Sequence, residues 1–398
     1  MDEGFFKKQP SGLETAERMK GFQSWLEIDL DAVGHNIDQV RAKTGVEIIP
    51  CVKTNAYGHG LVPVVAYMMR KGMGRVLVAK LWEALQIRDA GLSCGVVNMD
   101  PLYSENQFET VVEKDITQTI YQKEAAERLS AASKRMGKTA SVWVKVDTGL
   151  GRVGVRHTEA ADLVQHISVL PGLRIDGLFS TMSENDELDR LQVERMEKLR
   201  DELKRRGIKT GVTSMASSNA VFHKPYSYLD AVRPGLMLFG LYPEDEDRGH
   251  GIELRQSFRF MARIEHVKWV EAGESLTYSR RFTAPRRMRV GTLHIGYSDG
   301  YPRGLTQKGL VRVNGEVKPV LGTVSVNHVL VDLTGTDAGV GDAVETIGRE
   351  GENGAHNLCR LAGIMTYTLM VGMSPLTPRV YYLGGELVTL SESRLTEA

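Results

Sequence analysis

Cysteine is scarce in this chain, and its three cysteines, Cys51, Cys94 and Cys359, are widely spaced. No Cys-x-x-Cys pair or cysteine–histidine cluster occurs in the sequence, so neither a disulfide framework nor a metal site is predicted. The sequence also lacks an apolar run long enough to cross a bilayer. Its first residues lack the apolar core of a signal peptide. These absences predict a cytoplasmic protein without a membrane partner.

An excess of charge of either sign is also missing. Lys and Arg together number 50, as do Asp and Glu, so the formal net charge is zero. A basic field over the whole chain, which nucleic acid would require, is therefore not predicted. The length of 398 residues is enough for two or three domains and a large core.

Strand-like and helix-like segments alternate from about Trp25 to Gly240. The expected strands are WLEIDL, VEIIPCVK, RVLVAK, CGVVNM, ITQTIY, TASVWVKVD, LRIDGLFS, GVTSMAS and the segment around AVRPGLMLFG. Repeated strand–helix units imply a parallel sheet, either open and doubly wound or closed into a barrel. The number of units favours a (β/α)8 barrel.

The pattern changes after about Ser257, where helical periodicity fades. The stretch LVRVNGEVKPVLGTVSVNHVLVDLTG alternates with period two and contains Asn314–Gly315, a strong hairpin signal. We therefore predict an α/β protein with a (β/α)8 TIM barrel over residues 24–256 and a mostly antiparallel β domain over residues 257–390. Residues 1–23 are expected to form an extension that packs on it.

The segment CVKTNAYGHG, residues 51–60, is the most informative for chemistry. Lys53 lies where an apolar strand meets a glycine-rich turn, which in a barrel is the rim that carries active sites. Desolvation there would free its amine for Schiff-base chemistry, and Tyr57 with the turn could face an anion. A lone lysine in such a place is more often a surface lysine at a strand end.

Six segments, in the same order along the chain, favour the functional interpretation of Lys53, because together they resemble the alanine racemase family. They are CVKTNAYGHG, VKVDTGLGRVG, VRPGLMLFGLYP, LTYSRRFTA, IGYSDGYPR and GTVSVNHVLVDLTG. The resemblance spans roughly Trp25 to Tyr382. It implies an isomerase that uses pyridoxal 5′-phosphate (PLP), on a barrel followed by a β domain, and that racemises a free amino acid, alanine first.

The resemblance also assigns the two catalytic bases. Lys53 attaches the cofactor and acts on one face of the substrate α-carbon, while Tyr278 acts on the other. Racemisation removes a proton from one face and returns it to the opposite one, so two acid–base groups must flank the carbon. A homodimer is implied, with Tyr278 reaching into the partner's barrel. Without the resemblance, Tyr278 would read as an ordinary loop tyrosine.

Further residues take roles by the same resemblance. The cofactor contacts are Lys53, Tyr57, Arg233, Ser218 and Gly235, with Ser217 an alternative to Ser218. The substrate contacts are Arg152, Val326 and Tyr297. Lys145 matches a lysine that is carbamylated in many relatives. Structural ion pairs for Arg233 and Lys145, and a core position for Tyr297, are the alternative interpretations.

Three departures from the family pattern leave the substrate open. Thr181 occupies the position of a histidine that stacks on the PLP ring, which leaves Met182 as a possible support. Ser325, Val326, Asn327 and His328 stand where the family usually has Cys-Met-Asp-Gln. Pro375 falls where many members have a phosphate-contacting tyrosine. A racemase of broad specificity for serine, lysine or other amino acids, a PLP-dependent decarboxylase and a non-catalytic PLP-binding protein therefore remain alternatives.

The segment GLGRVG, residues 149–154, imitates a dinucleotide-binding fingerprint. Its expected helix begins near Thr158, beyond the third glycine. Because a dinucleotide phosphate binds at the helix N-terminus, the pattern does not favour a nicotinamide or flavin cofactor.

Overall fold

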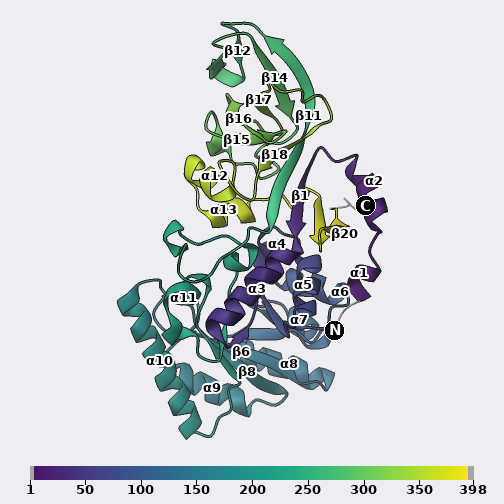
Figure 1. The fold of residues 1–398 in the computed structure, drawn as a ribbon. Helices are drawn as coiled ribbons and strands as arrows, with labels where there is room; N and C mark the ends of the chain where they lie inside the picture. The colour runs from purple at the N-terminus through teal and green to yellow at the C-terminus, as the bar shows by residue number, and fades with distance from the viewer. Residues whose placement is uncertain (1–3, 393–398) are drawn as a thin grey trace.

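A computed structural model describes residues 4–392 of the chain (Figure 1). The molecule is elongated, with a barrel of strands and helices at one end and a β domain at the other. Strand β11 (Phe258–Val270) runs from their junction towards the tip of the β domain (Figure 1). Residues 1–3 of the expected N-terminal extension lie outside the described residues.

Eight parallel strands form the barrel, in the order β2-β10-β9-β8-β6-β5-β4-β3. They are β2 (Glu47–Ile48), β3 (Arg75–Val78), β4 (Gly95–Asn98), β5 (Thr117–Ile120), β6 (Ala140–Asp147), β8 (Leu173–Phe179), β9 (Val212–Ser214) and β10 (Ala231–Val232). The short β7 (Val155–Arg156) pairs with β6. A bridge between Cys51 and Leu77 joins the two ends of the series, so the ring closes. The predicted (β/α)8 barrel is confirmed.

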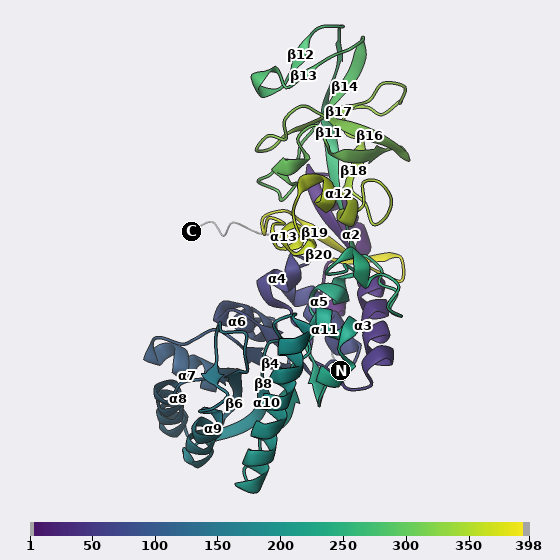
Figure 2. The same cartoon turned by 90° about the vertical axis from the view of Figure 1, so that its left-hand side faces the viewer.

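Helices cover the outside of the barrel (Figure 2). They are α3 (Leu30–Thr44), α5 (Leu61–Arg70), α6 (Leu81–Asp89), α7 (Glu105–Glu113), α8 (Lys123–Met136), α9 (Ala160–Val169), α10 (Asp186–Arg205) and α11 (Ser218–His223). The charged α10 shows how the sequence does this. The Asn185 side chain caps its first turn, and a stripe with helical spacing, Val193, Met196, Leu199 and Leu203, is buried. Within residues 4–392, none of the helices has the length and apolar character needed to span a membrane.

The β domain is built on antiparallel pairs, as predicted. Besides β11 it contains β12 (Ser275–Leu276), β13 (Phe282–Thr283), β14 (Met288–Leu293), β15 (Leu310–Val313), β16 (Glu316–Leu321), β17 (Val329–Asp332), β18 (Ala343–Ile347), β19 (Arg379–Leu383) and β20 (Glu386–Ser391), with helices α12 (Ala355–Ala362) and α13 (Thr366–Val371). Asn314 and Gly315 both have positive φ and join β15 to β16, so the predicted hairpin is confirmed.

Strand β1 (Ser24–Asp29) corrects one expectation. We expected WLEIDL as a barrel strand, but it lies in the sheet of the β domain, antiparallel to β11 and parallel to β19. Its side chains are buried on both faces until the last residue. A strand buried on both faces has no alternation that would tell which sheet it joins. Residue 24 therefore does not begin the barrel, while the division near residue 257 stays a prediction.

The N-terminal extension forms α1 (Gly4–Lys7) and α2 (Gly12–Met19). Ser11 and Glu14 close a capping box at the start of α2. This segment packs beside β20, where Met19 and Phe22 join a small apolar cluster with Trp25 and Val380.

Candidate active site

A cavity of about 280 Å³ opens at the C-terminal rim of the barrel. Each barrel strand contributes a residue at or just after its carboxyl end. The lining residues are Cys51, Lys53, Tyr57, Leu77, Met99, Thr119, Tyr121, Lys145, Arg152, Val153, Phe179, Thr181, Ser217, Ser218, Arg233, Gly235 and Tyr367. The cavity therefore gathers seven of the ten residues that the sequence singled out, together with Ser217. Tyr278, Tyr297 and Val326 are not among its lining residues.

Lys53 begins a short turn, α4 (Lys53–Tyr57), whose backbone is left-handed. Thr54, Asn55, Ala56 and Tyr57 all have φ between 51° and 56°. Non-glycine residues in this region carry a conformational cost, which surrounding contacts must offset. The buried carboxylate of Glu83 accepts the backbone N–H of Asn55 at 3.0 Å, and the Asn55 side chain accepts the N–H of Leu61 at 2.8 Å. Glu83 was not predicted from the sequence, because nothing in its own segment signals this contact.

The glycines that follow are wedged against strand β19. Arg379 donates to the carbonyl of Gly58 at 2.8 Å, and the Tyr381 hydroxyl donates to the carbonyl of His59 at 2.9 Å. A Cβ on Gly60 would lie 1.8 Å from the Tyr381 hydroxyl oxygen, so only glycine fits. Strand β19, from near the C-terminal end of the described residues, thus helps to hold the Lys53 turn in one conformation.

Tyr57, Ser218 and Tyr367 are three of the hydroxyl side chains that line the cavity, and Gly235 lines it with them. The rings of Tyr57 and Tyr367 lie 6.2 Å apart, and Ser218 Oγ accepts the N–H of Gly235 at 3.0 Å. Burial raises the pKa of both Tyr57 and Tyr367, which keeps the phenols protonated. Each phenol can therefore donate a hydrogen bond to an anion.

Tyr367 corrects the expectation placed on Pro375. We expected Pro375 to stand in place of a phosphate-contacting tyrosine, whereas Pro375 is exposed and does not line the cavity. Tyr367, on helix α13, supplies a tyrosine hydroxyl there instead. Helix α13 belongs to the C-terminal part of the sequence, in which the β domain was predicted. Its contact with the barrel rim depends on tertiary packing, which a local sequence pattern does not reveal.

The cavity is strongly basic. Lys53, Lys145, Arg152 and Arg233 line it, and no acidic side chain is among its lining residues. Arg233 is buried and donates to Ser214 Oγ at 2.6 Å and to the Ser180 carbonyl at 2.5 Å. Burial lowers the pKa of Arg233 to about 10, so the guanidinium stays charged at neutral pH. Such a cavity favours a ligand that carries negative charge.

Lys145 lies deep in the cavity at the end of β6. Its amine is 4.5 Å from the centre of the Phe179 ring and donates to the Thr181 hydroxyl. Burial, reinforced by the charges of Arg233 and Arg152, lowers the pKa of Lys145 to about 6. Thr181 therefore serves as a partner of Lys145, at the position where the resemblance led us to expect a histidine, while Met182 is buried outside the lining residues.

The glycine-rich segment at 149–154 forms the loop that carries Arg152. Asp147 Oδ1 accepts the N–H groups of Gly149 and Gly151, both at 3.0 Å. Strand β7 follows the loop, and α9 begins only at Ala160. The loop therefore lacks the helix N-terminus that a dinucleotide phosphate would need.

The remaining predicted residues lie on the surface of the β domain. Tyr278 is 73% exposed, Val326 47% and Tyr297 43%. Tyr278 follows β12, at the end of the molecule remote from the barrel (Figure 1). A single chain therefore keeps the predicted site in two halves, with Lys53 in one and Tyr278 in the other.

The loop around Tyr278 is held in a strained conformation. Thr277, Ser279 and Arg280 all have positive φ. The Thr277 hydroxyl accepts the N–H of Thr323 at 3.1 Å, and a Cβ on Gly322 would lie 2.2 Å from that hydroxyl oxygen. Strained loops of this kind persist where the surroundings fix them, and they concentrate at functional sites.

A closed barrel with a basic cavity at its C-terminal rim, followed by an antiparallel β domain, defines this chain as a barrel enzyme. Comparison with known proteins gives the family. Residues 28–243 match the family model for the N-terminal domain of alanine racemase, and residues 257–381 match the model for its C-terminal domain. The chain belongs to the alanine racemase family, a family of isomerases.

Individual relatives agree over nearly the whole chain. Alanine racemase 1 of Clostridium acetobutylicum is 32% identical over 377 residues, which cover 92% of this chain and 97% of the relative. The alanine racemase of Desulforamulus reducens is 34% identical over 366 residues, covering 90% and 98%. A solved alanine racemase structure from Clostridium difficile 630 superposes with a TM-score of 0.89 at 28% identity, covering 94% of this chain and 100% of that one.

Proposed function

We propose that this protein racemises alanine with PLP as cofactor, using Lys53 and Tyr278 as the two bases. The observation that carries the proposal is the rim cavity, which places four basic side chains, Lys53 among them, and seven hydroxyl side chains around one space. An amino acid and a phosphorylated cofactor both bring negative charge, which such a lining neutralises.

The cavity residues suit PLP at both of its ends. Tyr57, Ser218, Tyr367 and the Gly235 backbone would hold the phosphate, since hydroxyl groups and backbone turns are common phosphate ligands. Arg233 would face the pyridine nitrogen, to which a guanidinium can only donate a hydrogen bond. When bound, PLP acts as an electron sink that makes the α-proton of an attached amino acid acidic.

The close approach of Gly235 to Tyr57 provides a test of the phosphate end. A Cβ at residue 235 would lie 2.5 Å from the Tyr57 hydroxyl oxygen, although the backbone there has negative φ. We expect Gly235→Ala to displace Tyr57 and weaken PLP binding about tenfold, the cost of roughly one hydrogen bond to a charged group. Titration of the apoprotein with PLP, followed by absorbance, measures this.

Gly74→Ala is the matched control for that titration, since a Cβ there meets nothing within 4 Å. It should leave PLP affinity unchanged. If the Gly235→Ala and Gly74→Ala proteins bind PLP with equal affinity, the phosphate does not bind at this end of the cavity.

The proton transfers divide between the two bases. The Lys53 amine would take or give the α-proton on one face of the substrate α-carbon, and the Tyr278 hydroxyl would act on the opposite face. Tyr278 is exposed, and strand β12, which precedes it, lies at the end of the molecule remote from the barrel (Figure 1). Tyr278 would therefore act in the cavity of a second copy. The proposed assembly is therefore a homodimer with shared active sites, in which Val326 and Tyr297 complete the substrate pocket.

Arg152 would bind the substrate carboxylate, and Lys145 would help to position Arg152. A lysine with a pKa near 6 is largely a neutral amine at physiological pH, and a neutral amine can add to carbon dioxide. The nitrogen forms a bond to carbon and releases one proton, which leaves a carbamate of negative charge among cationic neighbours. That charge would pair with Arg152.

Carbamylation of Lys145 gives a pH-dependent prediction. With isotopically labelled bicarbonate, we expect a carbamate carbon signal near neutral and alkaline pH, and its loss as the pH falls through about 6, where Lys145 takes up a proton. Lys145→Ala should lack the signal at every pH. A signal that persists unchanged in Lys145→Ala would assign the carbamate to another amine.

Substrate range is the point on which alternatives remain. Asn327 replaces an acidic residue of the family pattern and donates to Ser298 Oγ at 2.9 Å, which favours a broader range such as serine or lysine as the second candidate. Chiral chromatography of a panel of L- and D-amino acids incubated with the PLP-loaded protein ranks the substrates. Fastest racemisation of alanine supports the proposal, whereas release of carbon dioxide would indicate a decarboxylase and no reaction a non-catalytic PLP-binding protein.

A further inference from the structure

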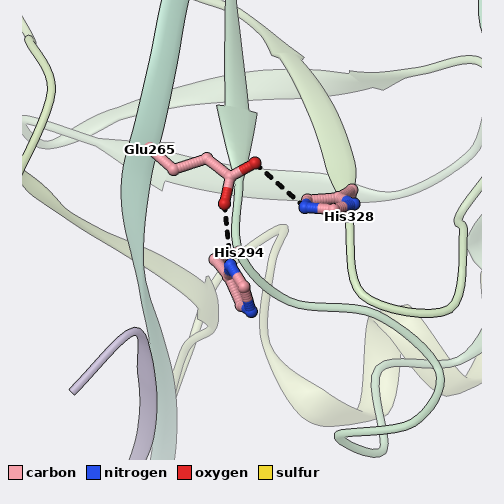
Figure 3. A group of neighbouring side chains, drawn as sticks. All are labelled: Glu265, His294 and His328. Carbon is pink, nitrogen blue, oxygen red and sulfur yellow. Dashed lines mark hydrogen bonds and ion pairs between the residues drawn. The ribbon is translucent and has the colours of Figure 1, made fainter.

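Two histidines and one glutamate meet on the surface of the β domain (Figure 3), and none of them lines the rim cavity. His294 Nδ1 lies 2.7 Å from one carboxylate oxygen of Glu265, and His328 Nε2 lies 2.9 Å from the other. The two imidazole rings are 5.3 Å apart and nearly perpendicular. One carboxylate thus faces two imidazole nitrogens, and the three residues together offer three ligand atoms for a metal ion.

Three neighbouring strands bring these residues together. Glu265 sits at an irregularity of β11, where one extra residue interrupts its pairing with β14. His294 directly follows β14, and His328 directly precedes β17, which pairs with β14 on its other side. A bulge re-aims the side chain that it carries, and here the re-aimed side chain meets both histidines. The residues are far apart in sequence, so their spacing gives no motif.

The donor chemistry matches a borderline divalent cation. One ligand atom from each residue lies within 4.8 Å of the others. Tetrahedral zinc binds imidazole nitrogen and carboxylate oxygen at about 2.0–2.2 Å, so ligand atoms around it stand roughly 3.3 Å apart. The two nitrogen–oxygen distances, 2.7 and 2.9 Å, are shorter than this, so a bound ion would require these partly exposed side chains to rotate apart. All three side chains are partly exposed, which leaves room for water as a fourth ligand.

We propose that Glu265, His294 and His328 form a zinc-type divalent cation site that ties the end of β14 to the segment Ser325–His328. The carbonyls of Ser325 and Val326 already accept the N–H groups of Tyr297 and Ser298, each at 3.1 Å. The Ser298 hydroxyl also donates to the Val326 carbonyl and accepts from the Asn327 side chain. A bound cation would add a further link between the same two segments, through His294 and His328. The site would thereby restrict the motion of the surface loop that carries Val326.

A plain ion-pair cluster is the competing explanation of the same geometry, and direct binding separates the two. Zinc chloride is titrated calorimetrically into the PLP-loaded protein after chelator treatment and dialysis. We expect one zinc ion per chain. Glu265→Gln and His328→Gln should each weaken binding by more than about tenfold, since removal of even an outer-shell partner of a metal costs that much.

His266→Gln is the matched control, because it removes an exposed histidine next to Glu265 that is not part of the cluster. It should bind zinc as the unaltered protein does. Cobalt(II) gives an independent readout, for which we expect visible absorption typical of a tetrahedral site, lost in His328→Gln. No zinc binding by the unaltered protein, or equal binding by Glu265→Gln and His266→Gln, would overturn the site.

Discussion

Lys53→Ala should abolish racemisation and the covalent attachment of PLP together. The substitution removes both the amine that holds the cofactor and one of the two proposed bases. Loss of a positioned acid–base group alone typically costs 10²- to 10⁴-fold in rate, so we expect a decrease of at least about a thousandfold. The visible absorption band of the lysine-bound cofactor should disappear from the purified protein at the same time.

Lys80→Ala is the matched control for this experiment. Lys80 also follows a barrel strand, but it is exposed and makes a surface ion pair with Asp100 at 3.9 Å. We expect full activity and the full absorption band from this protein. A Lys53→Ala protein that retains the band would show that another amine holds the cofactor, and Lys53 would then be an ordinary strand-end lysine.

Tyr278→Phe should leave PLP bound, because the residues that line the cavity of each chain are unchanged. The rate of racemisation should fall by about 10²- to 10⁴-fold, because one of the two proposed bases is lost. Tyr103→Phe, at another tyrosine that is more than 70% exposed (77%), is the control and should have no effect. The pairing of this variant with Lys53→Ala tests the shared site directly. Each pure homodimer should be nearly inactive.

Mixed dimers of the two variants should recover activity. If Tyr278 acts in the partner's barrel, a mixed dimer has one site with both bases intact and one with neither. Random exchange makes half of the dimers mixed, so about a quarter of the unaltered activity should return. If mixed dimers form, as shown by differently tagged chains, and no activity returns, each chain must use its own Tyr278, and the shared-site proposal fails.

The barrel could be predicted because the alternation of strands and helices is a local sequence signal. The turn at Asn314–Gly315 could also be predicted, because these two residue types favour the positive φ that a tight hairpin turn requires. Strand β1 was misplaced because its side chains are buried on both faces, and such a strand carries no signal for the sheet it joins. The position of Lys53 at the rim followed from the glycine-rich turn after an apolar strand.

The parts of the candidate site that the sequence missed all depend on contacts between distant segments. Glu83 supports the Lys53 turn from a different barrel unit, and Arg379 and Tyr381 reach the turn from the other end of the chain. Tyr367 enters the cavity from helix α13, while Pro375, which the sequence pattern singled out, lies outside it. Local periodicity cannot encode such approaches, because the chain returns to the rim only after folding.

Exchange of the α-proton of alanine in heavy water is the most direct test of whether this protein racemises alanine. The PLP-loaded protein is incubated with L-alanine and, separately, with D-alanine, with Lys53→Ala as the control. We expect both samples to gain deuterium at the α-carbon and to lose their enantiomeric purity, and neither change to occur with Lys53→Ala. If cofactor is bound through Lys53 and neither enantiomer exchanges its α-proton, the protein is not an alanine racemase.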